Sequence, residues 1–168
     1  MELTSSGSKL LSVPILNQNG SNGDQEGLCW AATVACICNY VNGYSLTAPA
    51  VASTMGIDEN VGANPDTAVK ALKKFDISSP TIINSNLSDT TTVSYINNNK
   101  PIYMQLTTDN NKNNHAVTLR GYVASSGGMT LSVMDSAYAA YRTAYSNGSS
   151  YCLTVANYHL TWYKSIVI

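Results

Sequence analysis

The feature of this sequence that most constrains its fold is an uninterrupted apolar stretch that begins at Cys29 and ends near the Asn-Gly pair at residues 42–43. A polar run rich in asparagine and glycine, residues 17–27, stops just before it. Within the stretch, Ala32, Cys36 and other small side chains recur at helical spacing, and the opposite face is apolar as well. This pattern predicts a helix that is buried on most sides and that ends at the Asn-Gly pair.

The first residue of this predicted helix is a cysteine, Cys29. Unpaired backbone N–H groups and the helix dipole favour negative charge at a helix N-terminus, so a thiol there is biased toward the thiolate. Such a position, more so beside an imidazolium, lowers a cysteine pKa from its usual value of about 8.5 by several units. The alternative is that Cys29 is a small core residue, as free cysteines usually are. The helix pattern alone leaves both interpretations open.

The length and charge of the chain limit the classes of function. A chain of 168 residues is long enough for one domain, residues 1–168, whose hydrophobic core needs no disulfides. Lys and Arg number 9 against 10 Asp and Glu, and no basic stripe is present, which argues against binding to nucleic acid. No apolar run approaches the length of a membrane span, so we expect no membrane partner.

The composition also indicates where the protein is located. Polarity comes from asparagine, serine and threonine, and 11 tyrosines accompany a single phenylalanine. This uncharged, tyrosine-rich composition is common in secreted bacterial proteins. No signal peptide precedes Lys9, so we expect a secreted or cell-surface bacterial protein whose signal peptide is absent from this sequence. We expect it to be a monomer.

The cysteines and histidines favour neither a disulfide scaffold nor a metal site. Cys29 and Cys36 are seven residues apart on the predicted helix, about 10 Å, which is too far to bridge. Cys36 and Cys38 point to different faces of the helix, while a bridge from either of them to Cys152 stays open. The histidines are solitary, so no metal-ligand spacing is present and we expect no metal and no cofactor. They are His115 and His159.

The order of the predicted elements indicates an α+β fold. Residues 1–8 are expected to be disordered, and the part from about 9 to 100 is mostly helical, with a short strand over residues 81–83. Three further helices are predicted, at residues 48–55, from Pro65 to about residue 75, and at residues 89–97. Each has a capping residue before it: Thr47, Asn64 and Ser88.

The part from about 101 to 168 is mostly β. Its predicted strands are rich in β-branched residues and tyrosine and are separated by turns of glycine, asparagine and serine. They cover residues 102–106, 115–123, 129–134, 141–145, 151–155 and 159–168. Helices followed by antiparallel strands favour an α+β arrangement over a doubly wound parallel sheet.

Two residues of this β part could serve a reactive cysteine, which needs a base and a group that orients the base. His115 opens one predicted strand, and Asp135 follows the next one. If these strands form an antiparallel pair, both side chains lie at the same end of the pair. Asp135 could then accept a hydrogen bond from one imidazole nitrogen while the other faces Cys29. Alternatively, His115 is a structural strand residue and Asp135 merely begins a turn.

Several short motifs resemble those of bacterial papain-like cysteine peptidases. They are Cys-Trp-Ala-Ala at residues 29–32, His-Ala-Val at 115–117 with Gly-Tyr at 121–122, Val-Met-Asp at 133–135 and Leu-Thr-Trp at 160–162. The chain is similar in particular to the C39-like, staphopain-like and AvrRpt2-like branches, from about residue 13 to its end. The resemblance implies a helical lobe that carries the nucleophile, a lobe of antiparallel sheet, and a cleft between them.

The resemblance also implies a role for each residue of the site. Cys29 would be the nucleophile, His115 the general base and acid, and Asp135 the residue that orients His115. These enzymes place a glutamine about six residues before the cysteine, where it donates to the oxyanion, but this position is Gly23 here. Either Gln18 or Gln25 is then expected to take that role, together with the backbone N–H of Cys29.

Three functions are compatible with these residues. The first is a cysteine endopeptidase that acts on a protein or peptide substrate through an acyl-enzyme. The second is another acyl transfer on the same triad, such as amidase, peptidoglycan peptidase or transglutaminase-like chemistry. The third is a non-catalytic binding module that keeps the fold. The displaced glutamine favours the binding module, whereas the intact Cys29, His115 and Asp135 argue against it.

Overall fold

The structure is a computed structural model that describes residues 7–24 and 27–168. Its helices are α1 (Cys29–Asn42), α2 (Ala48–Met55), α3 (Pro65–Lys74) and α4 (Asp89–Asn97). Its strands are β1 (Ser8–Leu10), β2 (Thr81–Ile83), β3 (Ile102–Thr107), β4 (Asn114–Ser125), β5 (Gly128–Asp135), β6 (Ala140–Ser146), β7 (Tyr151–Val155) and β8 (Tyr158–Val167). These elements confirm the α+β class, and the helices and strands predicted from the sequence are present with small differences at their ends.

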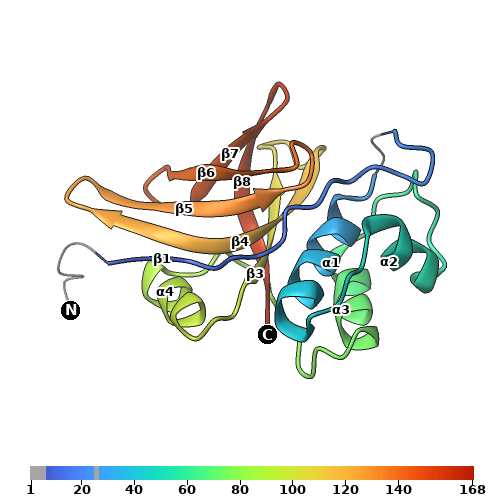
Figure 1. Cartoon of the computed structure of the whole chain (residues 1–168). Helices are drawn as coiled ribbons and strands as arrows, with labels where there is room; N and C mark the ends of the chain where they lie inside the picture. Colours follow the sequence, from blue (N-terminus) through green and yellow to red (C-terminus); the bar gives the residue numbers. More distant parts are fainter. Residues whose placement is uncertain (1–6, 25–26) are drawn as a thin grey trace.

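The strands form one antiparallel sheet that closes into a ring (Figure 1). Pairing runs in the order β4, β3, β8, β7, β6 and β5, and β5 pairs again with β4. Alternate side chains of β3, namely Ile102, Met104 and Leu106, belong to the larger core cluster together with Trp162 of β8. Because side chains alternate along a strand, the neighbouring residues of β3 face the other way.

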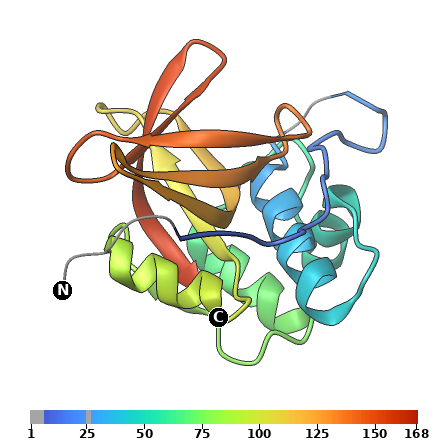
Figure 2. The same cartoon turned by 60° about the vertical axis from the view of Figure 1, so that its left-hand side comes forward.

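That other face of the sheet packs against α1. Tyr103 of β3 and Ala116 of β4 share a second core cluster with residues of α1, α2 and α3. Figure 1 and Figure 2 show these three helices together at one side of the sheet. All residues of α1 from 30 to 38 are buried, which confirms the prediction of a helix enclosed on most sides. Its small alanine and cysteine side chains allow the sheet and two helices to approach it closely.

The division into a helical part and a β part is less clean than the sequence suggests. β1 pairs with β4 and β2 pairs with β8, so two segments from the first hundred residues belong to the sheet. Helix α4 packs against β4 and β1, away from α1–α3 (Figure 1). The prediction of disorder over residues 1–8 is wrong for Ser8, which pairs with Val123 in β4; residues 1–6 lie outside the described residues.

Candidate active site

Cys29 is the first residue of α1, and its N-terminus differs from those of the other helices. The side chains of Thr47, Asn64 and Ser88 cap α2, α3 and α4, whereas the N-cap residue of α1 is Leu28, no side chain of the described residues caps this helix, and its first turn contains no acid. The half-buried thiol of Cys29 therefore lies where the helix has backbone N–H groups to offer. This position favours the thiolate.

His115 and Asp135 meet at one end of the β4–β5 pair, as the sequence predicts. The two strands are antiparallel, with Thr118 opposite Met134, so the start of β4 lies beside the end of β5. His115 Nε2 donates to Asp135 Oδ1 at 2.8 Å, and both side chains are buried. The side chain of His115 also hydrogen-bonds with the Cys29 thiol.

The three side chains shift one another's pKa values in the directions that favour the charged form of each group. Burial raises the pKa of the Cys29 thiol, but the hydrogen bond and charge of His115 and backbone contacts outweigh it, and the pKa is lowered. Burial lowers the pKa of His115, but Asp135 and Cys29 raise it to about 9. Burial raises the pKa of Asp135, and the hydrogen bond to His115 brings it below its ordinary value. The arrangement stabilises a thiolate beside an imidazolium.

Gln18 lies beside the same end of β5. Its backbone N–H donates to the Ser136 carbonyl at 3.3 Å, and its side-chain Oε1 accepts from the Ser136 hydroxyl at 3.0 Å. Ser136 directly follows Asp135 in the chain, so Gln18 is held next to the histidine–aspartate pair. Gln25, the other candidate, lies outside the described residues.

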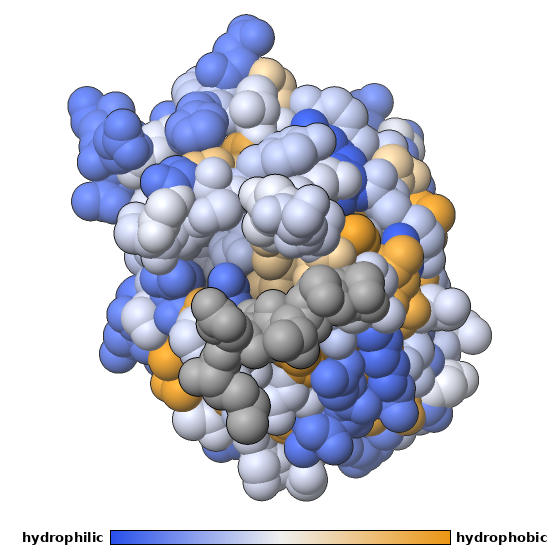
Figure 3. Space-filling view, turned by 90° about the vertical axis from the view of Figure 1, so that its left-hand side faces the viewer, coloured by the Kyte–Doolittle hydropathy of each residue, from blue (hydrophilic) through white to orange (hydrophobic). Residues whose placement is uncertain are grey.

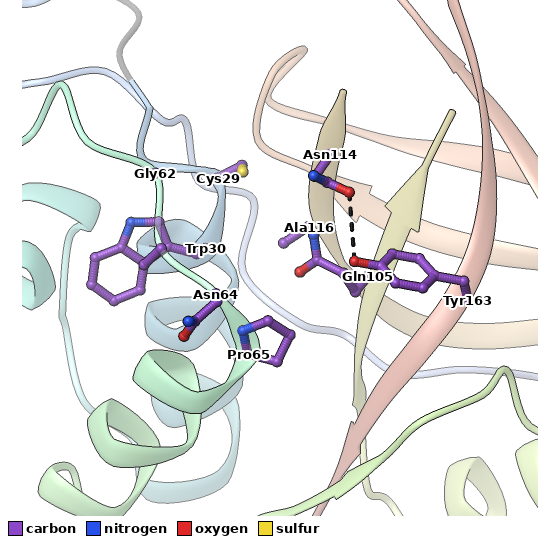
Figure 4. Close-up of a pocket in the computed structure, with 10 residues that line it drawn as sticks. Cys29, Trp30, Gly62, Asn64, Pro65, Gln105, Asn114, Ala116 and Tyr163 are labelled. Atoms are coloured by element: carbon purple, nitrogen blue, oxygen red, sulfur yellow. Dashed lines mark hydrogen bonds between the residues drawn. The ribbon is translucent and has the colours of Figure 1, made fainter. Parts of the chain in front are cut away.

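A pocket of about 290 Å³ opens beside the thiol (Figure 4). One wall consists of Cys29, Trp30 and the segment 62–65 that leads into α3. The other wall comes from the sheet. Its residues are Gln105 of β3, Asn114 and Ala116 of β4, and Tyr163 of β8.

The comparison with protein families agrees with this geometry, since the sequence profile of the Peptidase_C39 like family matches residues 10–165. The chain belongs to the Peptidase_C39 like family. No curated protein matches the chain in sequence. Membership in this family confirms the resemblance to C39-like papain-type cysteine peptidases and indicates cysteine peptidase activity in general.

In this Peptidase_C39 like protein, Asp135 has a further partner that sequence reasoning missed. Arg142 of β6 donates to Asp135 Oδ2 at 2.9 Å, and the backbone N–H of Ala137 donates to Oδ1 at 3.1 Å. The guanidinium also lies over the ring of Tyr138, 4.2 Å from its centroid. Arg142 flanks the same turn as Asp135 and has the matching strand parity, which is the signal that could have indicated it.

The remaining cysteines and the second histidine stand apart from this site. All four cysteines are free, so neither bridge to Cys152 is present. Cys36 and Cys38 are buried in different core clusters, and burial raises the pKa of each to about 12. His159 is exposed on β8. Within residues 7–24 and 27–168, no group of three or more His, Cys, Asp or Glu could hold a metal ion, and no helix is both long and apolar enough to cross a membrane.

Proposed function

We propose that this protein is a cysteine endopeptidase, with Cys29 as nucleophile, His115 as general base and acid, and Asp135 as the residue that orients His115. The observation that carries this proposal is a single buried imidazole that hydrogen-bonds to Asp135 at 2.8 Å and to a cysteine at a helix N-terminus. A nucleophile, a base and an orienting acid in this relation are the parts that covalent acyl transfer needs.

In the first half of the reaction, the Cys29 thiolate attacks the carbonyl carbon of the scissile bond. A carbon–sulfur bond forms and the carbonyl oxygen becomes an oxyanion. When the carbonyl re-forms, the carbon–nitrogen bond breaks and the His115 imidazolium gives its proton to the leaving amine. The product is a thioester on Cys29 with a neutral imidazole beside it.

In the second half, His115 takes a proton from a water molecule as the water oxygen attacks the thioester carbonyl. The carbon–sulfur bond then breaks, and Cys29 leaves as a thiolate beside a newly formed imidazolium. Asp135 stabilises this imidazolium through its hydrogen bond and its charge, and the enzyme returns to its starting state.

For the oxyanion we favour Gln18 over Gln25, with the backbone N–H of Cys29 as the second donor. The support for Gln18 is its pair of contacts with Ser136, which fixes the carbonyl end of the side-chain amide and holds the residue next to Asp135. A donor fixed in advance stabilises the developing charge without reorganising during the reaction.

We further infer a papain-like division into two lobes, with α1–α3 in one, the closed sheet in the other, and the substrate between them. The pocket with one wall from each side supports this view. A protein or peptide substrate, a monomeric state and a secreted or cell-surface location belong to the same proposal.

The test compares the unchanged protein with Cys29→Ala on a mixture of denatured proteins, with the cleavage products identified by mass spectrometry. We expect internal cleavage by the unchanged protein and none by Cys29→Ala, with identical circular dichroism spectra. Cleavage by Cys29→Ala would contradict the proposal. Products joined to an added primary amine in place of water would instead indicate the transferase alternative.

A further inference from the structure

The pocket beside Cys29 contains a buried polar group with no partner. The side chain of Gln105 projects from β3 into the space between the two walls (Figure 4). Gln105 is only 5% exposed, and its Oε1 accepts no hydrogen bond from residues 7–24 or 27–168. A buried carbonyl oxygen without a donor is unfavourable, and most such groups in proteins are paired.

The register of the sheet explains why a glutamine occupies this place. Gln105 has the same strand parity as Tyr103, so it faces α1 rather than the core inside the ring. Tyr103 packs fully beneath the helix, whereas Gln105 is opposite Ala116, whose small side chain leaves room above the sheet. The side chain of Gln105 therefore reaches the pocket and lines it with a polar amide, where an aliphatic residue would offer only apolar contacts.

Two other polar side chains of the pocket already have partners, whereas the buried indole N–H of Trp30, which also lines the pocket, has none within the described residues. Asn64 accepts from the backbone N–H of Thr67 as the cap of α3, and Asn114 accepts from the Tyr163 hydroxyl at 3.5 Å. Apart from the reactive thiol, none of the ten residues that line the pocket carries an ionisable acid or base of the Asp, Glu, Lys, Arg or His type. A charged side chain would lose its hydration there, and the lining offers no opposite charge besides that of Cys29, which His115 already pairs.

We propose that this pocket selects a neutral carboxamide side chain, that of glutamine or asparagine, next to the scissile bond of the substrate, and that Gln105 is the specificity-determining residue. A carboxamide offers an N–H to the Gln105 oxygen and an oxygen to the Gln105 amide N–H, so two amides pair in both directions. An apolar side chain leaves Oε1 unpaired. This inference rests on the proposed peptidase function.

A kinetic experiment measures this preference. Short peptides of glycine, alanine and serine carry one glutamine, which is moved along the sequence one position at a time, and matched peptides carry methionine in its place. At one position we expect kcat/KM to be about tenfold or more higher for glutamine than for methionine, as two neutral hydrogen bonds allow. No glutamine preference at any position would overturn the proposal.

Two variants assign the preference to Gln105. In Gln105→Leu, which keeps the size of the side chain and removes both hydrogen-bonding groups, the glutamine-to-methionine ratio should fall about tenfold. The matched control is Thr92→Val on α4, outside this pocket, which removes a buried hydroxyl that likewise has no partner within the described residues. The control should keep the ratio. An unchanged ratio in Gln105→Leu would contradict the assignment.

A binding experiment separates this inference from the proposed activity. The Cys29→Ala protein, labelled with ¹⁵N, is titrated with the same peptides, and the side-chain NH₂ signal of Gln105 is identified by its loss in Gln105→Leu. We expect this signal to shift with the glutamine peptide and not with the methionine peptide. A shift without cleavage by the unchanged protein would refute the peptidase and keep the pocket assignment. Cleavage with equal shifts would do the reverse.

Discussion

At the scale of single residues, the two carboxylate oxygens of Asp135 accept hydrogen bonds from different partners. Oδ1 accepts from His115 and from a backbone N–H, and Oδ2 accepts from Arg142. Each contact stabilises the carboxylate, and the hydrogen bonds to charged groups are the stronger ones. In the proposed mechanism, Arg142 thus keeps Asp135 ionised and fixed while His115 exchanges protons with Cys29 and the substrate. We regard it as a positioning residue.

The first prediction concerns Asp135. Asp135→Asn removes the charge that stabilises the imidazolium while keeping the shape of the side chain. We expect kcat to fall by about 10²-fold or more and the alkaline limb of the rate profile, set by His115 with its pKa of about 9, to move to lower pH. Steady-state kinetics across pH measure both effects. A normal kcat with an unmoved alkaline limb would refute the orienting role.

Gln18 gives a second prediction at this scale. Gln18→Ala should lower kcat by about 10²–10³-fold if its amide donates to the oxyanion, with a much smaller change for Gln25→Ala. Single-turnover measurements of both variants give the comparison. Small and equal effects would mean that neither glutamine serves the oxyanion, and a reversed order would assign the role to Gln25.

A third prediction uses acid unfolding to test Arg142. The pKa of Asp135 is lower in the folded state, so its stabilising contribution is present above the unfolded pKa and is lost as pH falls through the folded one. Arg142→Met removes one cause of that lowering, so the midpoint of acid unfolding should move to higher pH.

The matched control for Arg142→Met is Arg120→Met. Arg120 also lies over a tyrosine ring, that of Tyr141, but it hydrogen-bonds to Ser132 and a backbone carbonyl instead of a carboxylate. Circular dichroism against pH measures the acid midpoint of each variant against that of the unchanged protein. Equal shifts in the acid midpoint would contradict the role given to Arg142.

At the scale of elements, the backbones of β1 and β4 approach each other closely, and this contact explains why residue 121 is a glycine. β1 pairs with β4 at Gly121. A Cβ added to this glycine would lie 2.4 Å from the Lys9 carbonyl oxygen and 2.8 Å from the Leu10 Cα. A bulge in the β4–β5 pairing occurs at the same point. The backbone of β1 can pair with β4 here only because residue 121 has no side chain.

The fourth prediction follows from this contact. Gly121→Ala should lower the free energy of unfolding by about 1–3 kcal/mol, since backbone atoms rather than a flexible side chain must move. Gly127→Ala in the β4–β5 turn is the control, because the only neighbour of its added Cβ is the Ser125 hydroxyl at 3.9 Å. Urea unfolding measures both variants. Equal stabilities would contradict the close approach of β1.

Sequence reasoning succeeded where the signal is local and failed where it depends on a distant partner. The caps Thr47, Asn64 and Ser88 mark helix starts through their own side chains, and all three helices are confirmed. β1 has three residues and no pattern of its own, so only its pairing with β4 makes it a strand. The closure of the ring by β4 and β5 is likewise a matter of long-range register.

At the scale of the whole molecule, the site joins segments that are far apart in the sequence. Cys29, His115 and Asp135 could be picked out because each is at an end of an element, where side chains reach a common edge. Arg142 and Gln105 were missed, because their positions depend on the β5–β6 register and on which face of β3 meets α1. On the face shown in Figure 3, outside the grey atoms, hydrophobic residues emerge in separate places among hydrophilic ones.

The central claim is that Cys29 and His115 form a thiolate–imidazolium pair, and site-resolved alkylation tests it most directly. Iodoacetamide labelling is followed by mass spectrometry from pH 4 to 9, with Cys36 and Cys38, whose pKa values are raised to about 12, as references in the same molecule. We predict rapid labelling of Cys29 at mildly acidic pH and loss of this reactivity in His115→Ala. If Cys29 labels only at alkaline pH and His115→Ala leaves its rate unchanged, the pair does not exist.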